Sequence, residues 1–419
     1  MNNPKIIVAH PGRQHSFRVA TALKKSGMLY KYATTVYNKD NSLLMKLTKL
    51  FLGKENARRA NKRKCPLVDD SEVLQFCEFE GLLLLALARI DSKRIITKAF
   101  MRYVSNRFQR KLANYIIKNK VDVVISYDCN SKLLFEILKE KAPNVIRVID
   151  NAHPNRHYLY HSYHEHWDAV GDFAKTMEAC GYITDESKSL EFGEEAKLAN
   201  YHIVASSYSQ KALEFEGIDS RNIFRVPYGV DDNKFLKSER PNPQDMLKVL
   251  FVGDVNQRKG IKQLLDAALK LKDRNIEFNL IGVGVEQAPE LYEPYQESVN
   301  FLGWVSFDEL LHQLKSNHVF LFPTMGEGFG LVLLEAMAAG MPVIVTPNCG
   351  GPDIVSEGTD GFVVPVGDSD IIVERLLHLQ ENPNLLNKMG TNAITKAHEF
   401  TWDKYEEGIV ASVKEMILR

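Results

Sequence analysis

Two glutamates, Glu327 and Glu335, are separated by seven residues within a glycine-rich stretch, residues 323–340. A carboxylate among glycines can accept hydrogen bonds from hydroxyl groups, and a sugar and a ribose are both sets of hydroxyls. Leu334 and Ala336 flank Glu335, so we expect it to lie in a poorly hydrated position. The alternative is that Glu327 is a solvated loop residue and Glu335 an exposed helix residue.

The segments on either side of this stretch predict how it is positioned. Residues 319–322 are apolar and β-rich, which indicates a buried strand, and residues 331–338 are apolar at helical spacing. The glycines at 326, 328 and 330 therefore lie in a loop between a strand and a helix, where parallel sheets bind ligands. Glycine lets the backbone approach a ligand closely, and the first N–H groups of a helix attract an anion.

A second strand, loop and helix begin with the buried run at residues 248–252, which leads into Gly253 and then to Arg258 and Lys259. Two adjacent positive charges in such a loop can clamp a diphosphate. The alternative is a solvated pair of basic residues.

His153 follows a predicted strand at residues 145–150, which places it at the ligand edge of that sheet. A hydrogen-bonded turn histidine is the alternative. The first strand, residues 5–9, leads to a loop with Gly12, Arg13 and His15. The role of this loop stays open, and one interpretation of Arg13 and His15 is that they are simply surface residues.

Glu327 and Glu335 together match the paired-glutamate motif of the retaining glycosyltransferases of family 4, which have the GT-B fold. The resemblance covers nearly the whole C-terminal half and is weaker in the N-terminal half. It implies that Glu327 contacts the hydroxyls of the donor sugar and Glu335 the ribose of the nucleotide. It also implies that Arg258 and Lys259 bind the pyrophosphate and that His153 lies near the sugar and phosphate.

The resemblance implies further donor contacts near the phosphates, the sugar and the base. Val305 is the expected base contact, unless it is only an apolar residue packed under its loop. The chain departs from the family in having a single glycine in its first loop and an aspartate after Gly253. The remaining expected donor-binding residues are Gly12, Gly253, Gly328, Phe329, Gly330 and Leu331.

The predicted fold is α/β, of the GT-B kind, with two Rossmann-like doubly wound domains facing each other across a cleft. Residues 1–237 are expected to form an acceptor-binding domain and residues 246–399 a nucleotide-sugar-binding domain. A polar stretch at 237–245 fits a linker. By the resemblance, a final helix at about 400–419 packs back on the first domain.

Charge is distributed unevenly, because residues 1–120 hold 25 Lys and Arg but only 8 Asp and Glu. Basic and apolar residues are mixed at 41–64 and 93–120, a pattern that suits an anionic membrane surface. A polyanionic acceptor and a plain basic face remain alternatives. We predict no nucleic-acid partner, since no recognition motif accompanies the charge.

The chain is predicted to be cytoplasmic, with a peripheral contact at the inner face of the cell membrane. Its five cysteines are scattered, it opens without a signal peptide, and its longest apolar run, residues 82–88, is too short to span a bilayer. His157 and His161 have a spacing that a metal site can use, but no His-Glu-x-x-His pattern is present. We predict no metal and no cofactor, with the nucleotide-sugar as a substrate.

The predicted activity is transfer of a hexosyl group from a nucleotide-diphosphate-sugar to a hydroxyl, with retention of the anomeric configuration. The acceptor is expected to be a lipid-linked or cell-surface glycan, as in lipopolysaccharide or capsule biosynthesis. The alternatives are a nucleotide-sugar epimerase or hydrolase on the same fold, and a non-catalytic subunit that binds nucleotide-sugar or membrane.

Overall fold

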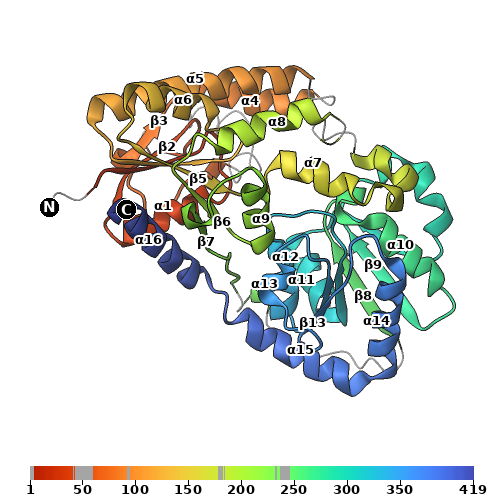
Figure 1. The fold of residues 1–419 in the computed structure, drawn as a ribbon. Helices are drawn as coiled ribbons and strands as arrows, with labels where there is room; N and C mark the ends of the chain where they lie inside the picture. Colours follow the sequence, from red (N-terminus) through yellow and green to blue (C-terminus); the bar gives the residue numbers. More distant parts are fainter. Residues whose placement is uncertain are drawn as a thin grey trace.

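The computed structural model describes residues 4–40, 42, 60–91, 95–177, 183, 185–231, 234–235 and 246–419. Residues 43–59 of the first basic stretch and the predicted linker at 237–245 lie outside this part of the chain. The described residues form two lobes, each built on a twisted parallel sheet with helices on both faces (Figure 1).

The first lobe contains a sheet of seven described strands, all parallel. Ile6 and Val8 pack into one hydrophobic cluster and Ile7 and Ala9 into another, because successive side chains of a strand point to opposite faces. Both faces are therefore buried. In spatial order the strands are β3 (Val73–Gln75), β2 (Leu29–Thr34), β1 (Ile6–Ala9), β4 (Val123–Tyr127), β5 (Ile146–Asn151), β6 (Tyr201–Val204) and β7 (Ile223–Arg225).

Helices cover both faces of this sheet, with α5 and α6 on one side and α1 on the other (Figure 1). The helix α7 lies between the two lobes, and its predecessor in the chain is the loop that carries His153. The helices of this lobe are α1 (Ser16–Lys25), α4 (Glu78–Ile90), α5 (Ile95–Asn119), α6 (Lys132–Lys141), α7 (Arg156–His164), α8 (Glu186–Ala196) and α9 (Ser207–Phe215).

The second lobe contains a sheet of six parallel strands. In spatial order they are β10 (Asn300–Gly303), β9 (Ile276–Ile281), β8 (Leu247–Val252), β11 (Val319–Phe322), β12 (Val343–Val345) and β13 (Gly361–Val363). Its helices are α10 (Ile261–Lys270), α11 (Phe307–Ser316), α12 (Leu331–Ala338), α13 (Gly351–Ile354), α14 (Ser369–Glu381) and α15 (Pro383–Ala397).

The chain crosses between the lobes twice, and described residues next to the two crossings lie side by side. Val230 forms a parallel bridge with Thr401 and donates its N–H to the carbonyl of Phe400 at 2.9 Å. After the second crossing, α16 (Trp402–Leu418) packs against α1 of the first lobe. The final helix thus returns to the lobe where the chain begins.

Gly260, which ends the loop after β8, has a backbone that only glycine tolerates at this site. Its φ is +70°, and a Cβ there would lie 1.8 Å from the carbonyl oxygen of Pro323. The loop after β8 therefore lies directly against the loop after β11, and the backbone carbonyl of Arg258 accepts a hydrogen bond from the N–H of Met325 at 3.0 Å.

We predict that Gly260→Ala destabilises the protein more than Gly358→Ala does. Gly358 has nearly the same φ, +69°, but nothing lies within 4 Å of its added Cβ. The control therefore measures only the strain of a left-handed residue, about 1–2 kcal/mol, while Gly260→Ala adds overpacking of about 1–3 kcal/mol. Thermal unfolding of both variants checks this, and equal midpoints would contradict it.

Candidate functional site

The order of the strands indicates where each lobe binds a ligand. In the first sheet the order reverses between β1 and β4, and in the second between β8 and β11. Ligands of doubly wound sheets bind beyond the carboxyl ends of the strands at such a switch point. The loops there contain Gly12 in the first lobe, and Arg258 and Glu327 in the second.

Glu327 is held by the two basic residues of the neighbouring loop. Its Oε2 atom accepts a hydrogen bond from Arg258 Nη1 at 2.9 Å and another from Lys259 Nζ. The three side chains are only 11–20% exposed. Lys259 Nζ also lies 4.9 Å from the ring centre of Phe322 at the end of β11. Residues that are 68 and 69 positions apart in the sequence thus form one charged cluster.

The charges in this cluster set the protonation of Glu327. Burial would raise the pKa of its carboxyl group, but the nearby Lys259 and Arg258 outweigh burial and lower the pKa to about 2. Burial also lowers the pKa of Lys259, an effect that Glu327 opposes. At neutral pH Glu327 is therefore a carboxylate. Arg258 Nη2 also lies 3.6 Å from Oδ2 of Asp254, so two carboxylates face the two cations.

The loop that carries Glu327 is docked onto the first lobe. A Cβ on Gly328 would lie 2.3 Å from the carbonyl oxygen of Ala152 and 3.4 Å from the Cα of His153. The carbonyl of Gly328 accepts hydrogen bonds from Ser206 Oγ at 2.5 Å and Ser209 Oγ at 3.1 Å. The structure thus brings Gly328 and His153 together.

His153 lies at the carboxyl end of β5, as the sequence predicts, with its side chain 49% exposed. Its Nδ1 atom is 3.5 Å from Oδ2 of Asp128, and Oδ1 of Asp128 accepts the N–H of Ala152 at 2.9 Å. Burial would raise the pKa of Asp128, but His153 and that N–H hold it below its ordinary value. Asp128 thus orients the imidazole, and the sequence analysis did not single it out.

Glu335 lies in α12, in an environment very different from that of Glu327. Its side chain has no hydrogen-bond or ion-pair partner among the described residues, and burial raises the pKa of its carboxyl group to about 7. The poorly hydrated position expected from its apolar neighbours is what the structure shows. A ligand with hydroxyl groups can supply the hydrogen bonds that Glu335 lacks.

The other predicted donor-binding residues lie in four loops. Phe329 is buried. Gly330 precedes α12 and Leu331 is its first residue. The first N–H groups of this helix have no partner within the helix. Gly253 follows β8 and donates to the carbonyl of Ile281 at 2.9 Å. Half-buried Val305 packs against the core just after β10, and Gly12 donates its N–H to His10 Nδ1 at 2.8 Å.

His15 is not a surface residue, which excludes that interpretation of it. Its side chain is 15% exposed, and its Nε2 atom lies 2.8 Å from Oδ2 of Asp150, which is itself 2% exposed. Burial lowers the pKa of His15, but Asp150 outweighs burial and raises it above the ordinary value. The periodicity of the sequence carries no signal for this pair, because its partners come from different strand ends, 135 residues apart.

Tyr228 joins three parts of the molecule that the sequence does not connect. Its ring lies 5.1 Å from that of His15, 5.5 Å from that of Phe329 and 5.6 Å from that of Tyr405. Tyr228 is therefore the contact between the first loop, the loop of Glu327 and helix α16.

A hollow of about 610 Å³ opens beside His153 in the first lobe. Its lining mixes positive and negative side chains. One of them, Glu195, accepts hydrogen bonds from the N–H groups of Cys129, Ser131 and Lys132 at 2.7–3.0 Å. The charged side chains of the lining are those of Arg102, Arg110, Asp128, Lys132, Glu136, Arg156, Glu191 and Glu195. Such a surface offers both donors and acceptors to a polar ligand.

The architecture matches that of known GT-B structures over nearly the whole chain. Sucrose-phosphate synthase from Thermosynechococcus elongatus superimposes with a TM-score of 0.66 at 17% identity, covering 99% of both chains. The lipopolysaccharide outer core galactosyltransferase WaaB superimposes with a TM-score of 0.62 at 17% identity, covering 98% of this chain and 99% of that one. The fold is GT-B, as the sequence predicts.

Residues 232–396 match the family model described as glycosyl transferases group 1. A phosphatidyl-myo-inositol mannosyltransferase from Mycolicibacterium smegmatis is 30% identical over 48% of this chain and 53% of its own length. An uncharacterized protein in the cps region of Klebsiella pneumoniae is 31% identical over 41% of this chain and 50% of its own length. The chain thus spans about half the length of the curated relatives it matches.

We predict that Glu335→Gln removes a pH dependence of stability. A carboxyl group whose folded pKa lies above its unfolded value stabilises the fold most when protonated, and that stability is lost as pH rises from about 4.5 to 7. Between pH 5 and 8 the wild type should lose roughly 1–3 kcal/mol more than the variant. Urea unfolding at both pH values measures this, with the exposed Glu290→Gln as control. The prediction would be contradicted if the free energy of unfolding changed by the same amount between the two pH values in the wild type and in both variants.

Proposed function

We propose that this protein transfers a hexosyl group from a nucleotide-diphosphate-sugar to an acceptor hydroxyl and retains the anomeric configuration. The observation that carries the proposal is the cluster of Arg258, Lys259 and Glu327, set against His153 at the facing ligand edges of two sheets. The family match over residues 232–396 supports it. So does the structural likeness to Anabaena Alr3699/HepE, solved in complex with UDP-glucose, at a TM-score of 0.60 and 15% identity.

Arg258 and Lys259 are proposed to hold the diphosphate. Glu327 is bonded to both cations, whereas Asp254, the other carboxylate beside Arg258, is 61% exposed and 3.6 Å away, so an anionic ligand can replace it at Arg258. A guanidinium group and an ammonium group side by side suit adjacent phosphates. The N–H groups at the start of α12 would add to this positive potential.

Glu327 is proposed to orient the sugar. Its Oε2 atom is occupied by the two cations, while Oε1 has no hydrogen-bond partner among the described residues, which leaves it available to a sugar hydroxyl. By the same logic Glu335 would accept the ribose hydroxyls. A carboxylate with a pKa of about 2 is a poor proton acceptor at neutral pH. We therefore assign the acceptor proton to the departing diphosphate.

In the proposed reaction, the bond from the anomeric carbon to the diphosphate oxygen breaks and a bond to the acceptor oxygen forms on the same face of the sugar. The proton of the acceptor hydroxyl passes to the diphosphate. The cations stabilise the charge that develops on the leaving group, and the backbone and side chains of the loop hold the reactants in place. His153 would contact the sugar and phosphate from the opposite lobe.

The acceptor is proposed to be a lipid-linked glycan that binds in the hollow beside His153. The mixed charges of that hollow suit a ligand rich in hydroxyl groups. Met101 of α5 lines the hollow and is 51% exposed, and Ile96 and Tyr103 of the same helix are also exposed. An apolar tail could thus leave the hollow along the outer surface of α5.

The first test is a screen of nucleotide-diphosphate-sugars with the purified protein, in which the anomeric configuration of the product is read by proton NMR. We predict that Glu327→Gln lowers kcat at least about 100-fold. The control is Glu406→Gln, another buried glutamate with two cationic neighbours, Lys25 at 2.6 Å and Arg18 at 3.8 Å, which lies on α16 outside the cluster.

An inverted product would refute retention, and hydrolysis of the donor in every acceptor mixture would refute transfer. A Glu327→Gln enzyme as active as Glu406→Gln would refute the role of the cluster.

A peripheral membrane contact is proposed for the outer surface of α4 and α5. Exposed apolar residues form a stripe at helical spacing on α4, namely Phe79, Leu83, Ala86 and Ile90. In contrast, Phe108, Leu112 and Ile116 in the second half of α5 pack into the core, so that part of the predicted basic stretch serves the fold. No helix in the described part of the chain is long and apolar enough to cross a bilayer.

We predict that the protein binds vesicles containing phosphatidylglycerol more tightly than vesicles of phosphatidylcholine, and less tightly at high salt. The double variant Phe79→Ser/Ile90→Ser should lower binding at least about tenfold, because it removes two exposed apolar side chains from the stripe. Vesicle sedimentation measures this. Leu418→Ser, which removes an 86% exposed apolar residue at the other end of the lobe, is the control and should bind normally. The prediction would be contradicted if both variants lost vesicle binding equally, or if the double variant bound vesicles like the wild type.

A further inference from the structure

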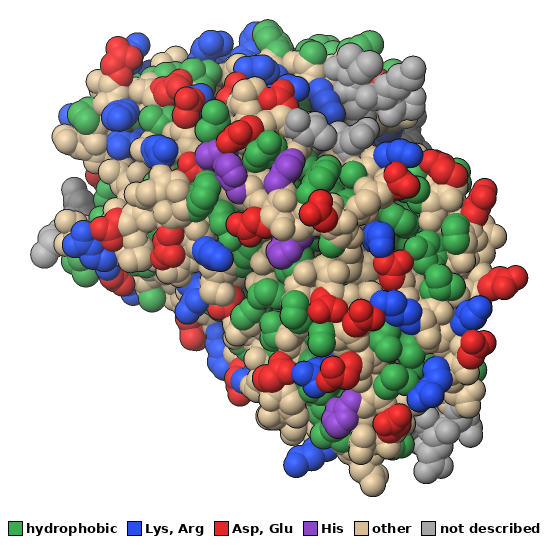
Figure 2. Space-filling model, turned by 45° about the vertical axis from the view of Figure 1, so that its right-hand side comes forward, with side chains coloured by type: hydrophobic (Ala, Val, Ile, Leu, Met, Phe, Trp, Pro, Cys, Tyr) green, Lys and Arg blue, Asp and Glu red, His purple; other side chains and the backbone are tan. Residues whose placement is uncertain are grey.

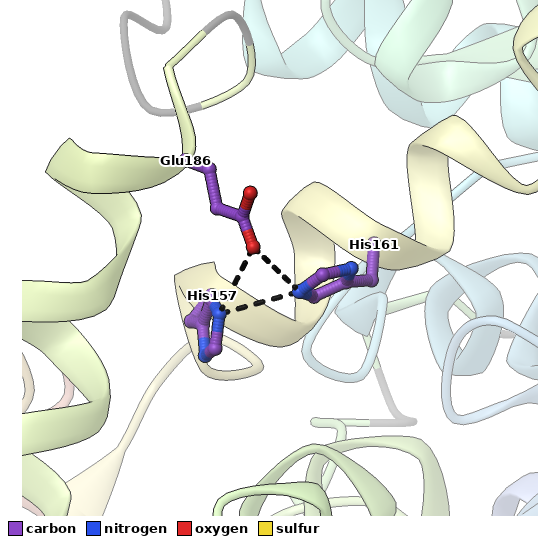
Figure 3. A group of neighbouring side chains, drawn as sticks. All are labelled: His157, His161 and Glu186. Atoms are coloured by element: carbon purple, nitrogen blue, oxygen red, sulfur yellow. Dashed lines mark hydrogen bonds and ion pairs between the residues drawn. The ribbon is translucent and has the colours of Figure 1, made fainter.

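A cluster of two histidines and one glutamate lies outside the proposed catalytic site. His157 and His161 stand one turn apart on α7, and Glu186 is the first residue of α8 (Figure 3). Their ligand atoms converge: the two Nε2 atoms are 3.2 Å apart, and Glu186 Oε1 is 3.4 Å from His161 Nε2 and 3.9 Å from His157 Nε2. The sequence offered only the histidine pair, because Glu186 comes from another helix.

These distances are close to those of a tetrahedral metal site. Bonds of about 2.0–2.2 Å to nitrogen and oxygen place the ligand atoms about 3.3–3.5 Å apart. The three observed separations lie around this value, and all three atoms are within 4.8 Å of one another. Small side-chain rotations would therefore complete three corners of a tetrahedron.

Hydrogen bonding alone satisfies this cluster poorly. Nδ1 of His157 lies 2.7 Å from Oε1 of Glu216, a side chain that is 4% exposed. This contact places the proton on Nδ1 and leaves the lone pair of Nε2 directed at the cluster. A proton on His161 Nε2 would then face two acceptors, His157 Nε2 and Glu186 Oε1. A cation at the centre would satisfy all three atoms at once.

The surroundings have the features of a metal site. Glu216 provides the carboxylate partner that metal-binding histidines use to fix their orientation and tautomer. Gly193 of α8 leaves room for it, since a Cβ there would lie 2.2 Å from Glu216 Oε2. The ring of Phe215 lies 5.6 Å from that of His157 and 5.2 Å from that of His161 and forms an apolar wall on one side. In Figure 2, several histidines gather on the face of the molecule that includes the boundary between the lobes.

We propose that His157 Nε2, His161 Nε2 and Glu186 bind a zinc ion, with water as the fourth ligand. Two imidazoles and a carboxylate are ligands that Zn²⁺ favours. The ion would fasten α7 to α8. Because the opposite side of α7 packs against the loop of Glu327, where a Cβ on Gly326 would lie 2.8 Å from Leu159 and 2.9 Å from Tyr163, the ion would also steady that loop. The site stands apart from the proposed transfer reaction.

The proposal predicts one Zn²⁺ per chain. The full-length protein is first treated with a chelator, and Zn²⁺ alone is then added back in equilibrium dialysis and calorimetry. We expect His161→Ala and Glu186→Gln each to weaken Zn²⁺ binding at least about tenfold. Both side chains are partly exposed, at 37% and 50%, so the variants should fold. Zn²⁺ should raise the thermal midpoint of the wild type and leave that of the variants unchanged.

The matched control is His164→Ala, which removes an exposed histidine from the same helix outside the cluster. It should bind Zn²⁺ like the wild type. Substitution with Co²⁺ provides a second readout, because its visible absorption reports tetrahedral coordination. Wild-type protein that binds no stoichiometric Zn²⁺ would overturn the proposal, and so would variants that bind as well as the wild type. An equal loss in His164→Ala would show scattered surface binding and overturn it too.

Discussion

The contact between Glu327 and the cations Arg258 and Lys259 is the interaction on which the rest of the site depends. Three largely buried charges are stable only while all three are present, since removing one partner of a buried pair typically costs about 3–5 kcal/mol. The cluster therefore fixes the loop after β8 against the loop after β11. It also places two cationic side chains at the point where the strand order of the second sheet reverses.

Close backbone contacts extend this constraint to the other lobe. Gly260 lets the loop after β8 touch Pro323, and Gly328 lets the loop after β11 touch Ala152. In both places the neighbouring atom is a carbonyl oxygen that a Cβ would meet well inside van der Waals contact. Gly328 thus allows the loop of Glu327 to pack against the first lobe, which brings His153 to the same edge.

The sequence predicts the parts of this arrangement that depend on local pattern. Strand, loop and helix can be read around residues 253–260 and 323–340, and the apolar neighbours of Glu335 predict its poorly hydrated position. The pairs that close the site cannot be read in this way. The order of the strands brings together two such pairs, His15 with Asp150 and His153 with Asp128. The spacing of residues along the chain does not encode which strand ends become neighbours.

Helix α7 shows why contacts that the sequence does not predict matter for the geometry of the site. It begins just after His153, its inner face packs on Gly326 beside Glu327, and its outer face carries His157 and His161. A short helix of nine residues has little stability of its own, so its position is set by what holds its two faces. The inner face is held by the second lobe, and the outer face by Glu216 and Glu186. The geometry of His153 relative to Glu327 therefore depends on contacts made on the far side of α7, outside the pocket itself.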